Sequence, residues 1–241
     1  MKQLHSIFSL TLIVLVLLSA CKKDDVTPTS TETADTTGTI DSTDTNTPGT
    51  TMSVQARLDS GQTPFEIYQD DNDNLNELYG ASYEGGIIAY LNTEDGSGFV
   101  AIESYIDTVS DWGCSNKTLF ETVVLGTETT YIPIAIGSSI GAGKYNTDAI
   151  AEKCFVGVSL YTAGYTVDGF GDWVVPSTDE MIEVSKNLAS KIELHDSYWT
   201  STQENVLKNA KVYAVNTEDH SASLVPKVSS VYRAVCLIRS F

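Results

Sequence analysis

Two short apolar runs separated by turn residues give the clearest structural pattern in this chain. Residues 86–92 (GIIAYLN) and 98–103 (GFVAIE) contain the β-branched side chains that favour extended strands. The five residues between them, 93–97 (TEDGS), are of the types that dominate turns. The pattern therefore predicts a β-hairpin over residues 86–103.

Two later segments have the apolar periodicity of helices. Residues 147–163, capped by Asn146 or its neighbour, carry one apolar stripe that includes Cys154. A second helix is predicted to begin at Ser177, because Glu180 stands three residues later, at the spacing of a capping box. We expect Cys154 to face the core.

The last third of the chain has the pattern of strands. Apolar and β-branched residues recur in short runs that are separated by polar turn residues. The predicted strands are residues 198–202, 211–216, 223–227 and 231–238. Strands, two helices and further strands together predict an α+β domain, with two helices packed on a mainly antiparallel sheet.

The N-terminus has the features of an export signal. A basic start is followed by an apolar run at residues 12–18, too short to span a bilayer, and by the sequence LSAC at 18–21. These last four residues resemble a bacterial lipobox, in which Cys21 is lipidated and becomes the mature N-terminus. We therefore expect a signal peptide at 1–20 and a membrane anchor on Cys21; the alternative is an ordinary signal peptide with a chance cysteine.

Residues 21–53 are predicted to form a disordered stalk. Thr and Ser make up 15 of the 28 residues from 26 to 53. A segment with so few apolar residues cannot bury enough apolar surface to offset the entropy lost on ordering. The charged start at 22–25 resembles an export signal that sends lipoproteins to the outer face of Gram-negative bacteria, and 35–37 and 41–43 resemble an O-glycosylation pattern. Residues 54–82 are an extension that we expect to pack partly on the following domain.

The net negative charge of the chain limits the classes of molecule that it can bind by charge attraction. The chain has a formal charge of −18, and loss of Lys2 with the signal peptide makes it −19, from 13 basic and 32 acidic residues. Such a surface repels nucleic acids, acidic polysaccharides and anionic lipid headgroups. The acidic run at 70–74 lacks the glycine and distal glutamate of a calcium-binding loop, so we expect a solvated turn there.

No motif for catalysis or for a cofactor stands out. The glycine-rich segment 137–144 has the wrong spacing for a phosphate-binding loop, and we expect its glycines to permit tight turns before a helix. His195 and His220 lie in polar segments without a nucleophile motif. We expect no enzyme activity, no cofactor and no metal site, although paired carboxylates remain possible among 32 acidic residues.

One loop is the candidate ligand-binding surface. Trp112 is flanked by Asp111 and a glycine, which favours an exposed ring; the alternative is a tryptophan in the core. We therefore place the possible ligand surface at Trp112, Asp111 and Asn116, within loop 104–118 and beside loop 203–209. Three cysteines remain when Cys21 is lipidated, and the sequence alone leaves their three possible pairings open.

Four ordered motifs resemble one known family. Residues 85–91 (GGIIAYL), 171–180 (GDWVVPSTDE), 198–202 (YWTST) and 232–236 (YRAVC) resemble the C-terminal domain family of the bacterial collagen-like adhesin Lcl. The likeness covers residues 83–241. It departs from the family pattern at Ala89, where Phe is usual, at Val174, where Arg is usual, and at 237–238, just before the closing Arg239.

The resemblance implies a variant of the C-type lectin-like fold, which this family shares with formylglycine-generating enzymes. It also implies a disulfide between Cys154 and Cys236, which would leave Cys114 free or paired with another chain. The lectin calcium motifs are absent, and one spare thiol cannot supply the cysteine pair of the enzyme branch.

Together these features predict a lipoprotein of the Gram-negative outer membrane, displayed at the cell surface. Its domain is expected to recognise a glycan or protein ligand without catalysis. The alternatives are an enzyme, either a hydrolase or a relative of the formylglycine-generating group, and a structural component of an envelope complex.

Overall fold

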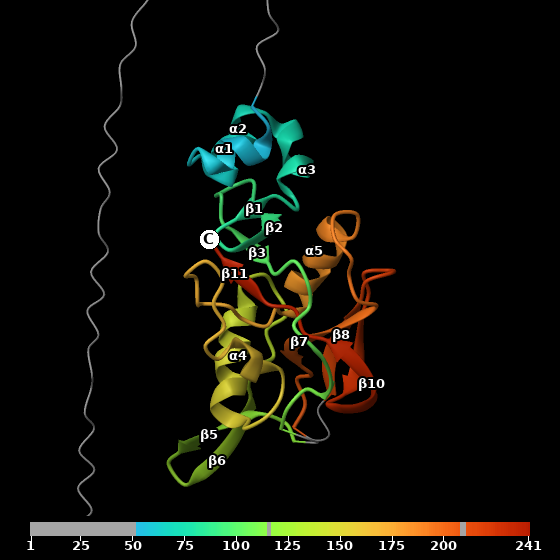
Figure 1. Cartoon of the computed structure of the whole chain (residues 1–241). Helices are drawn as coiled ribbons and strands as arrows, with labels where there is room; N and C mark the ends of the chain where they lie inside the picture. Colours follow the sequence, from blue (N-terminus) through green and yellow to red (C-terminus); the bar gives the residue numbers. More distant parts are fainter. Residues whose placement is uncertain (1–51, 115–116, 208–210) are drawn as a thin grey trace, which may run out of the picture. The chain divides into compact units, whose positions relative to one another are not determined.

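The structure is a computed structural model that describes residues 52–114, 117–207 and 211–241. The predicted signal peptide, Cys21 and nearly all of the predicted stalk lie outside these residues. The described residues belong to one compact unit (Figure 1). Among the described residues, no helix has the length and hydropathy that a membrane crossing requires.

The described residues contain five α-helices, two short 3-10 helices and eleven strands. The helices are α1 (Val54–Asp59), α2 (Pro64–Asp70), η1 (Asn72–Asn74), α3 (Leu75–Leu78), α4 (Ala142–Lys153), η2 (Val158–Thr162) and α5 (Thr178–Leu188). The strands are β1 (Ser82–Tyr83), β2 (Gly86–Leu91), β3 (Gly98–Ala101), β4 (Thr108–Asp111), β5 (Phe120–Leu125), β6 (Glu128–Pro133), β7 (Ser197–Gln203), β8 (Lys211–Asn216), β9 (Ala222–Pro226), β10 (Val228–Ala234) and β11 (Ile238–Ser240).

The strands form three sheets, and nearly all of their pairings are antiparallel. One sheet has the order β1-β2-β3-β11 and a second has the order β4-β10-β7-β8-β9. The single parallel pairing joins β10 to β7, and β5 and β6 form a separate two-stranded sheet. Helix α5 packs against β2 on one side and against β7 and β8 on the other. The predicted α+β class with mainly antiparallel sheets is therefore confirmed.

Several predicted strands are confirmed, and one is divided. The hairpin of β2 and β3 forms as expected, and the strands predicted at 198–202, 211–216 and 223–227 match β7, β8 and β9. The strand predicted at 231–238 is instead two strands in different sheets, β10 and β11. Between them the chain crosses from one sheet to the other, and loop 102–106 donates backbone hydrogen bonds to Val235 and Leu237 there. Residues 234–238, where the chain crosses between the sheets, are apolar and buried.

The N-terminal extension shares the core of the rest of the unit. Thr63 and Glu66 form a capping box at the start of α2, which fixes the direction of that helix. Ile67 on α2 and Leu78 on α3 are fully buried in the same apolar cluster as β2 and β3. The expected packing of residues 54–82 against the domain is therefore present through these side chains.

Helix α4 begins and ends earlier than its apolar stripe predicts. It starts after Gly141, whose φ of 89° is the left-handed conformation that glycine adopts without strain, and it ends at Lys153, with Cys154 as its C-cap. Asn146 and Thr147 are interior residues of the helix instead of caps. Their buried side chains bond to the backbone of Gly137 and of Val175, so each ties the helix to a neighbouring segment.

The N-terminal ends of α4 and α5 meet at one buried carboxylate. Glu180 forms the predicted capping box with Ser177, whose backbone N–H donates to Oε2 at 2.6 Å. The backbone N–H of Gly141 donates to Oε1 of the same side chain at 2.8 Å. Burial raises the pKa of Glu180, although these backbone donors favour its charged form. One side chain thus satisfies donors at the starts of two helices.

Strands β4, β5 and β6 are not predicted by the apolar pattern. The residues of β5 and β6 are largely exposed on both faces, so no alternation of buried and exposed positions marks them. Their threonines and glutamates are compatible with a loop as well as with a strand. Pairing between the two segments, which only the folded backbone reveals, defines them as strands.

Removing the Glu180 carboxylate should destabilise the fold. Glu180→Ala leaves the N–H groups of Gly141 and Ser177 without their acceptor, so we expect the free energy of unfolding to fall by roughly 2–4 kcal/mol. Urea unfolding followed by circular dichroism measures this change. The matched control is Glu183→Ala on the same helix, where a half-exposed pair with Lys186 should contribute less than about 1 kcal/mol. Equal losses in the two variants would contradict the role given to Glu180.

Candidate functional site: an acidic cleft with two tyrosines

The predicted ligand-contacting tryptophan is a core residue. Trp112 is fully buried, and its Nε1 donates a hydrogen bond to the carbonyl of Thr200 at 2.6 Å. Its backbone N–H donates to Lys227, and its carbonyl accepts from Val158. The expectation of an exposed ring is therefore wrong, because the ring is buried against Thr200 of β7 and against the ammonium group of Lys227.

The other residues of the predicted ligand surface do not gather into one site. Asp111 is half-buried at the end of β4, and its carboxylate accepts the backbone N–H of Gly113 at 2.8 Å. It lines a hollow of about 320 Å³ together with Tyr161 and Tyr232. Asn116 lies outside the described residues, as do residues 208–209 of the second predicted loop.

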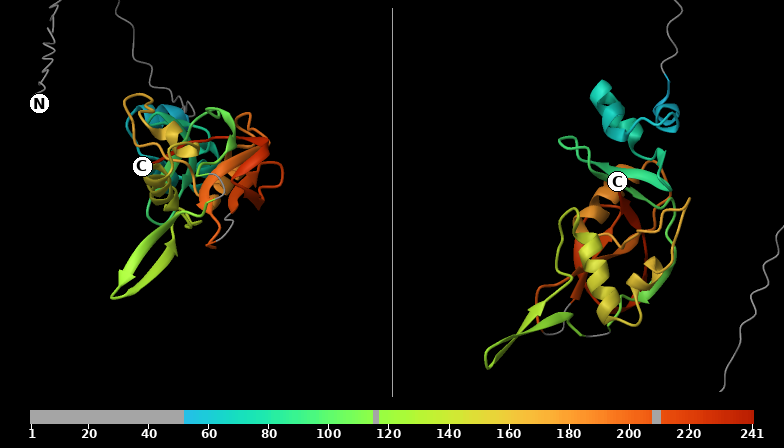
Figure 2. Two further views of the ribbon diagram at one scale, coloured as in Figure 1. Left: turned by 90° about the horizontal axis from the view of Figure 1, so that it is seen from below. Right: turned by 90° about the vertical axis from the view of Figure 1, so that its left-hand side faces the viewer.

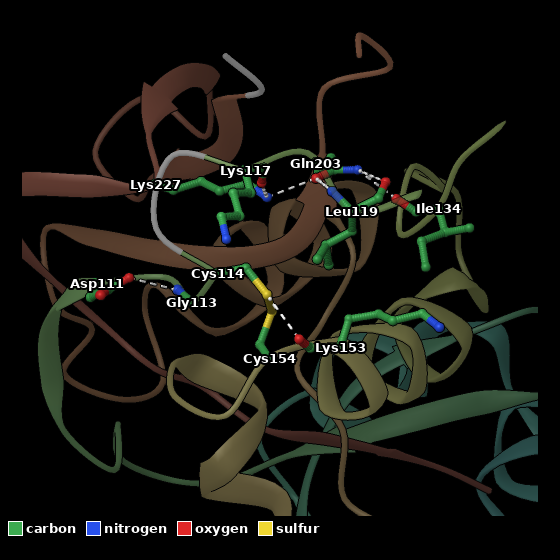
Figure 3. The surroundings of a disulfide bond; sticks show 10 residues. All are labelled: Asp111, Gly113, Cys114, Lys117, Leu119, Ile134, Lys153, Cys154, Gln203 and Lys227. Carbon is green, nitrogen blue, oxygen red and sulfur yellow. Dashed lines mark hydrogen bonds between the residues drawn. A yellow bond between two sulfur atoms is a disulfide. The ribbon is translucent and has the colours of Figure 1, made fainter. Parts of the chain in front are cut away.

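The disulfide joins Cys154 to Cys114, in place of the expected Cys236 (Figure 3). Cys154 is the C-cap of α4, and its Cα lies 5.1 Å from that of Cys114. Gly113 makes this approach possible: its φ is 120°, and a Cβ there would lie 2.6 Å from the carbonyl oxygen of Val156. Cys236 lies between β10 and β11 as a free, buried thiol, and burial raises its pKa to about 12.

A buried lysine, Lys227, bonds to the backbone of Lys117, three residues after Cys114. The Nζ of Lys227 donates to the carbonyl of Lys117 at 2.6 Å and to the Oε1 of Gln203 at 2.8 Å (Figure 3). It also lies 4.6 Å from the ring centroid of Trp112, a cation–π contact. Burial lowers the pKa of Lys227 to about 8, because the charged form is poorly solvated. The side-chain amide of Gln203 in turn makes two hydrogen bonds to the backbone of Leu119. Its Oε1 accepts the N–H of Leu119, and its Nε2 donates to the carbonyl of Leu119.

These contacts change the expected role of loop 104–118. In its second half, Cys114 is held by the disulfide and Lys117 by the buried Lys227, so these two positions are part of the framework. Its first half, by contrast, reaches a cavity: Ser104 lines a cleft of about 490 Å³, a volume within the range of small-ligand sites.

The cleft lies where the N-terminal extension meets two tight turns. Its walls come from α1, from the β1–β2 turn, from the segment after β3 and from residues 165–168. The lining residues that carry its chemistry are Asp59, Tyr83, Glu84, Glu103, Tyr165 and Asp168. None of these was singled out by the sequence motifs, because the residues are far apart in the chain and ordinary in type.

Backbone geometry holds the two turns against each other. Glu84 and Gly85 both have positive φ, at 45° and 82°, as do Asp168 and Gly169, at 51° and 88°. This is the type I′ geometry of two-residue hairpins, for which Asp-Gly is a strong sequence signal. A Cβ at Gly85 would lie 2.8 Å from the carbonyl oxygen of Val167, so glycine is required for this close approach. The Asp168–Gly169 pair is the one sequence signal that could have located this wall.

Both tyrosine rings in the cleft pack against a second aromatic ring. Tyr83 meets Phe241 edge to face at 5.2 Å between ring centroids, and Tyr165 meets Trp173 in the same way at 5.8 Å. Each tyrosine is half-buried, and desolvation raises the pKa of each hydroxyl. Because these two rings are already fixed by packing and remain partly open to solvent, they can stack on the apolar face of a ligand with little further loss of conformational entropy.

The residues that line the cleft carry negative charge. Four carboxylates line it, and the lining includes no lysine or arginine. Glu84 is paired with the guanidinium of Arg239 at 2.6 Å, and Asp59 accepts a hydrogen bond from Gln55 at 2.8 Å. Arg239 also bonds to Asp172 and lies over the ring of Phe170, so it fixes the β1–β2 turn to loop 170–172. Glu103 and Asp168 are exposed at the rim.

A second hollow of about 410 Å³ shares Glu103 and Ser104 with the cleft. It also contains His195, whose ring packs edge to face on Tyr105 and whose Nδ1 accepts the backbone N–H of Ser197. Over the described ranges, no hydrogen bond joins the Ser104 hydroxyl to His195, so the contact between a nucleophile and its base is missing.

The other histidine contacts a serine that substrate could not reach. His220 Nδ1 lies 3.0 Å from the Oγ of Ser185, but Ser185 is fully buried on α5 and its hydroxyl donates to the carbonyl of Ile182. Within the part of the chain that the structure describes, no group of three or more His, Cys, Asp or Glu side chains is arranged to hold a metal ion.

No family model matches the sequence, and no curated protein matches it significantly.

The cysteine pairing can be tested by differential alkylation of the folded protein. Peptide mapping without reduction should find Cys114 joined to Cys154, and Cys236 should be alkylated only after unfolding, because its thiol is buried and protonated. Cys114→Ser should lower the free energy of unfolding by roughly 2–4 kcal/mol, whereas Cys236→Ser should keep the disulfide. A peptide that joins Cys154 to Cys236 would overturn the pairing.

Lys227 should make stability depend on pH. Its pKa is about 8 in the fold and about 10.4 in an unfolded chain, so the unfolded chain binds the proton more tightly. The free energy of unfolding should therefore rise between about pH 8 and about pH 10, and Lys227→Met should remove this rise. Urea titrations at both ends of that range measure the difference between variant and wild type. The exposed Lys186, changed to Met, serves as the control, and parallel pH profiles for all three proteins would refute the effect.

Proposed function

We propose that this chain is a surface-displayed lipoprotein of the Gram-negative outer membrane, whose domain binds a ligand without catalysis. The lipobox-like residues before Cys21 and the Thr-rich stalk support the location. The four ordered motifs support a domain of the Lcl C-terminal type, a variant of the C-type lectin-like fold. An α+β unit with mainly antiparallel sheets is compatible with that fold.

The observation that carries the binding function is the cleft with its two braced tyrosines. Tyrosine faces stack on the apolar faces of sugar rings, and carboxylates accept hydrogen bonds from hydroxyl groups. Tyr83 and Tyr165 supply the rings, and Glu103 and Asp168 supply exposed acceptors at the rim. Their negative charge disfavours acidic polysaccharides. The ligand that fits best is a neutral glycan.

A protein ligand with basic side chains is the second candidate, because the cleft lining is acidic and has no basic residue. The two candidates differ in their response to salt. Stacking on a neutral sugar should be nearly independent of ionic strength, whereas binding of a basic peptide should weaken as salt is added.

The purified protein should be screened on a glycan array and on a panel of matrix proteins, and the affinity of each hit should then be measured. Tyr165→Ala should weaken binding about tenfold, equivalent to about 1.4 kcal/mol, because it removes one stacking face. Tyr165→Phe should retain most of the affinity, since it keeps the ring. For a basic ligand, Glu103→Gln should also weaken binding, and added salt should remove the difference.

The control is Tyr232→Ala, which changes an exposed tyrosine in the separate hollow beside Asp111. It should leave the affinity unchanged. A loss of binding in this variant alone would move the site to that hollow. Absence of any hit in both screens would leave the binding function without support.

A further inference from the structure

The hairpin of β5 and β6 is a sheet with no third strand in the described residues. Its six residue pairs run in register from Phe120 with Pro133 to Leu125 with Glu128. Figure 2 shows the hairpin standing away from the rest of the unit in both views. Two-stranded hairpins are marginally stable alone, and this one is anchored at its base by Gln203, which bonds to Leu119 and Ile134.

Apolar side chains on both faces of this hairpin are open to solvent. The exposed large apolar residues are Phe120, Val124, Leu125, Tyr131 and Ile132. Phe120 and Tyr131 meet edge to face at 4.9 Å, but neither is covered by another element. Exposed apolar groups that lie together on a projecting hairpin favour contact with another surface.

Hairpin geometry identifies the free hydrogen-bonding groups on β5. The turn residues are Gly126 and Thr127, so Leu125 and Glu128 form the hydrogen-bonded pair that closes a two-residue turn. Hydrogen-bonded and non-hydrogen-bonded pairs then alternate along the ladder. The N–H and C=O groups of Phe120, Thr122 and Val124 consequently point outward, and no described residue outside the hairpin bonds to them.

The outer edge of β5 lacks the features that usually prevent strand pairing. Lysines, prolines and bulges are the common protections of an edge strand. No Lys or Arg occurs from residue 118 to residue 143, and β5 contains no proline and pairs without a register shift. The outer edge of β6 is less suitable, because Pro133 has no N–H to donate there.

Charge favours contact between two copies at this hairpin over contact elsewhere. The chain carries 32 acidic residues, but residues 112–147 contain only Glu121 and Glu128 among them. Two copies of an acidic chain therefore repel each other least where their hairpins meet.

The sequence of β5 is complementary to itself in one antiparallel register. With Thr122 opposite Thr122, the outward groups face each other, and Phe120 falls opposite Val124 twice. Thr–Thr and aromatic–β-branched pairs are favourable neighbours across strands. Glu121 falls opposite Val123, so the two glutamates are not paired with each other.

We propose that β5 pairs with β5 of a second copy of this chain, with Thr122 on the two-fold axis, to give a four-stranded sheet β6-β5-β5-β6. The contact is isologous, so it closes at two copies. The pair uses the outward backbone groups of Phe120, Thr122 and Val124 from each chain. It is independent of the ligand cleft.

Cysteine cross-linking of the full chain tests the register. In a hydrogen-bonded antiparallel pair the two Cα atoms lie about 5.5 Å apart, a separation that a disulfide can span. Thr122→Cys should therefore give a covalent dimer under mild oxidation, seen on a non-reducing gel. The matched control is Thr129→Cys on the outer edge of β6, which should give no covalent dimer on the same gel. Equal cross-linking of both variants, or none at Thr122, would overturn the proposal.

Proline substitution tests the edge itself. Thr122→Pro removes an outward N–H without removing a bond between β5 and β6, so the hairpin can persist while the edge is blocked. Sedimentation of the detergent-solubilised full chain over a concentration series should show a dimer for the wild type and its loss for Thr122→Pro. Thr129→Pro, the same change on the β6 edge, should leave the dimer intact.

Circular dichroism of the two proline variants establishes that both are folded. If the wild type is monomeric at every concentration, the proposal is wrong and the edge is left to another segment or another protein. Loss of the dimer in Thr129→Pro but not in Thr122→Pro would assign the contact to β6 and equally overturn it.

Discussion

The buried carboxylate of Glu180 is the contact on which the arrangement of the two long helices depends. It accepts backbone N–H groups from Gly141 and Ser177, and the Ser177 hydroxyl donates to two carbonyls in the loop before α4. The starts of α4 and α5 are therefore fixed to each other. Helix α5 contacts β2 of one main sheet and β7 and β8 of the other, so the Glu180 contact joins α4 to the helix that packs on both sheets.

A second buried polar group fixes the opposite region of the unit. Lys227 under Trp112, with Gln203 beside it, holds the loop that the Cys114–Cys154 disulfide also constrains. Burial of a cationic group raises the free energy of the folded state, and here contacts with a carbonyl, an amide oxygen and an aromatic ring offset part of this rise. Cys114 and Lys117 are consequently part of the framework.

The cleft and the β5 edge have different physical origins. In the cleft, two turns with positive φ bring Tyr83 and Tyr165 together from distant parts of the chain. At the edge, unpaired backbone groups and exposed apolar side chains lie on a hairpin that no other described element covers. One feature is suited to a small ligand and the other to an extended strand, so the unit could engage both at once.

Local patterns in the sequence determined the β2–β3 hairpin, the capping box of α5 and the α+β class, because turn chemistry and capping act between residues near in the chain. Only the tertiary structure decided which cysteine pairs with Cys154 and whether Trp112 is buried. It also decided which residues line the cleft. Each of these depends on distances between segments far apart in sequence, and a stripe or a motif does not encode such distances. Only the Asp168–Gly169 turn carried a local signal for a wall of the cleft.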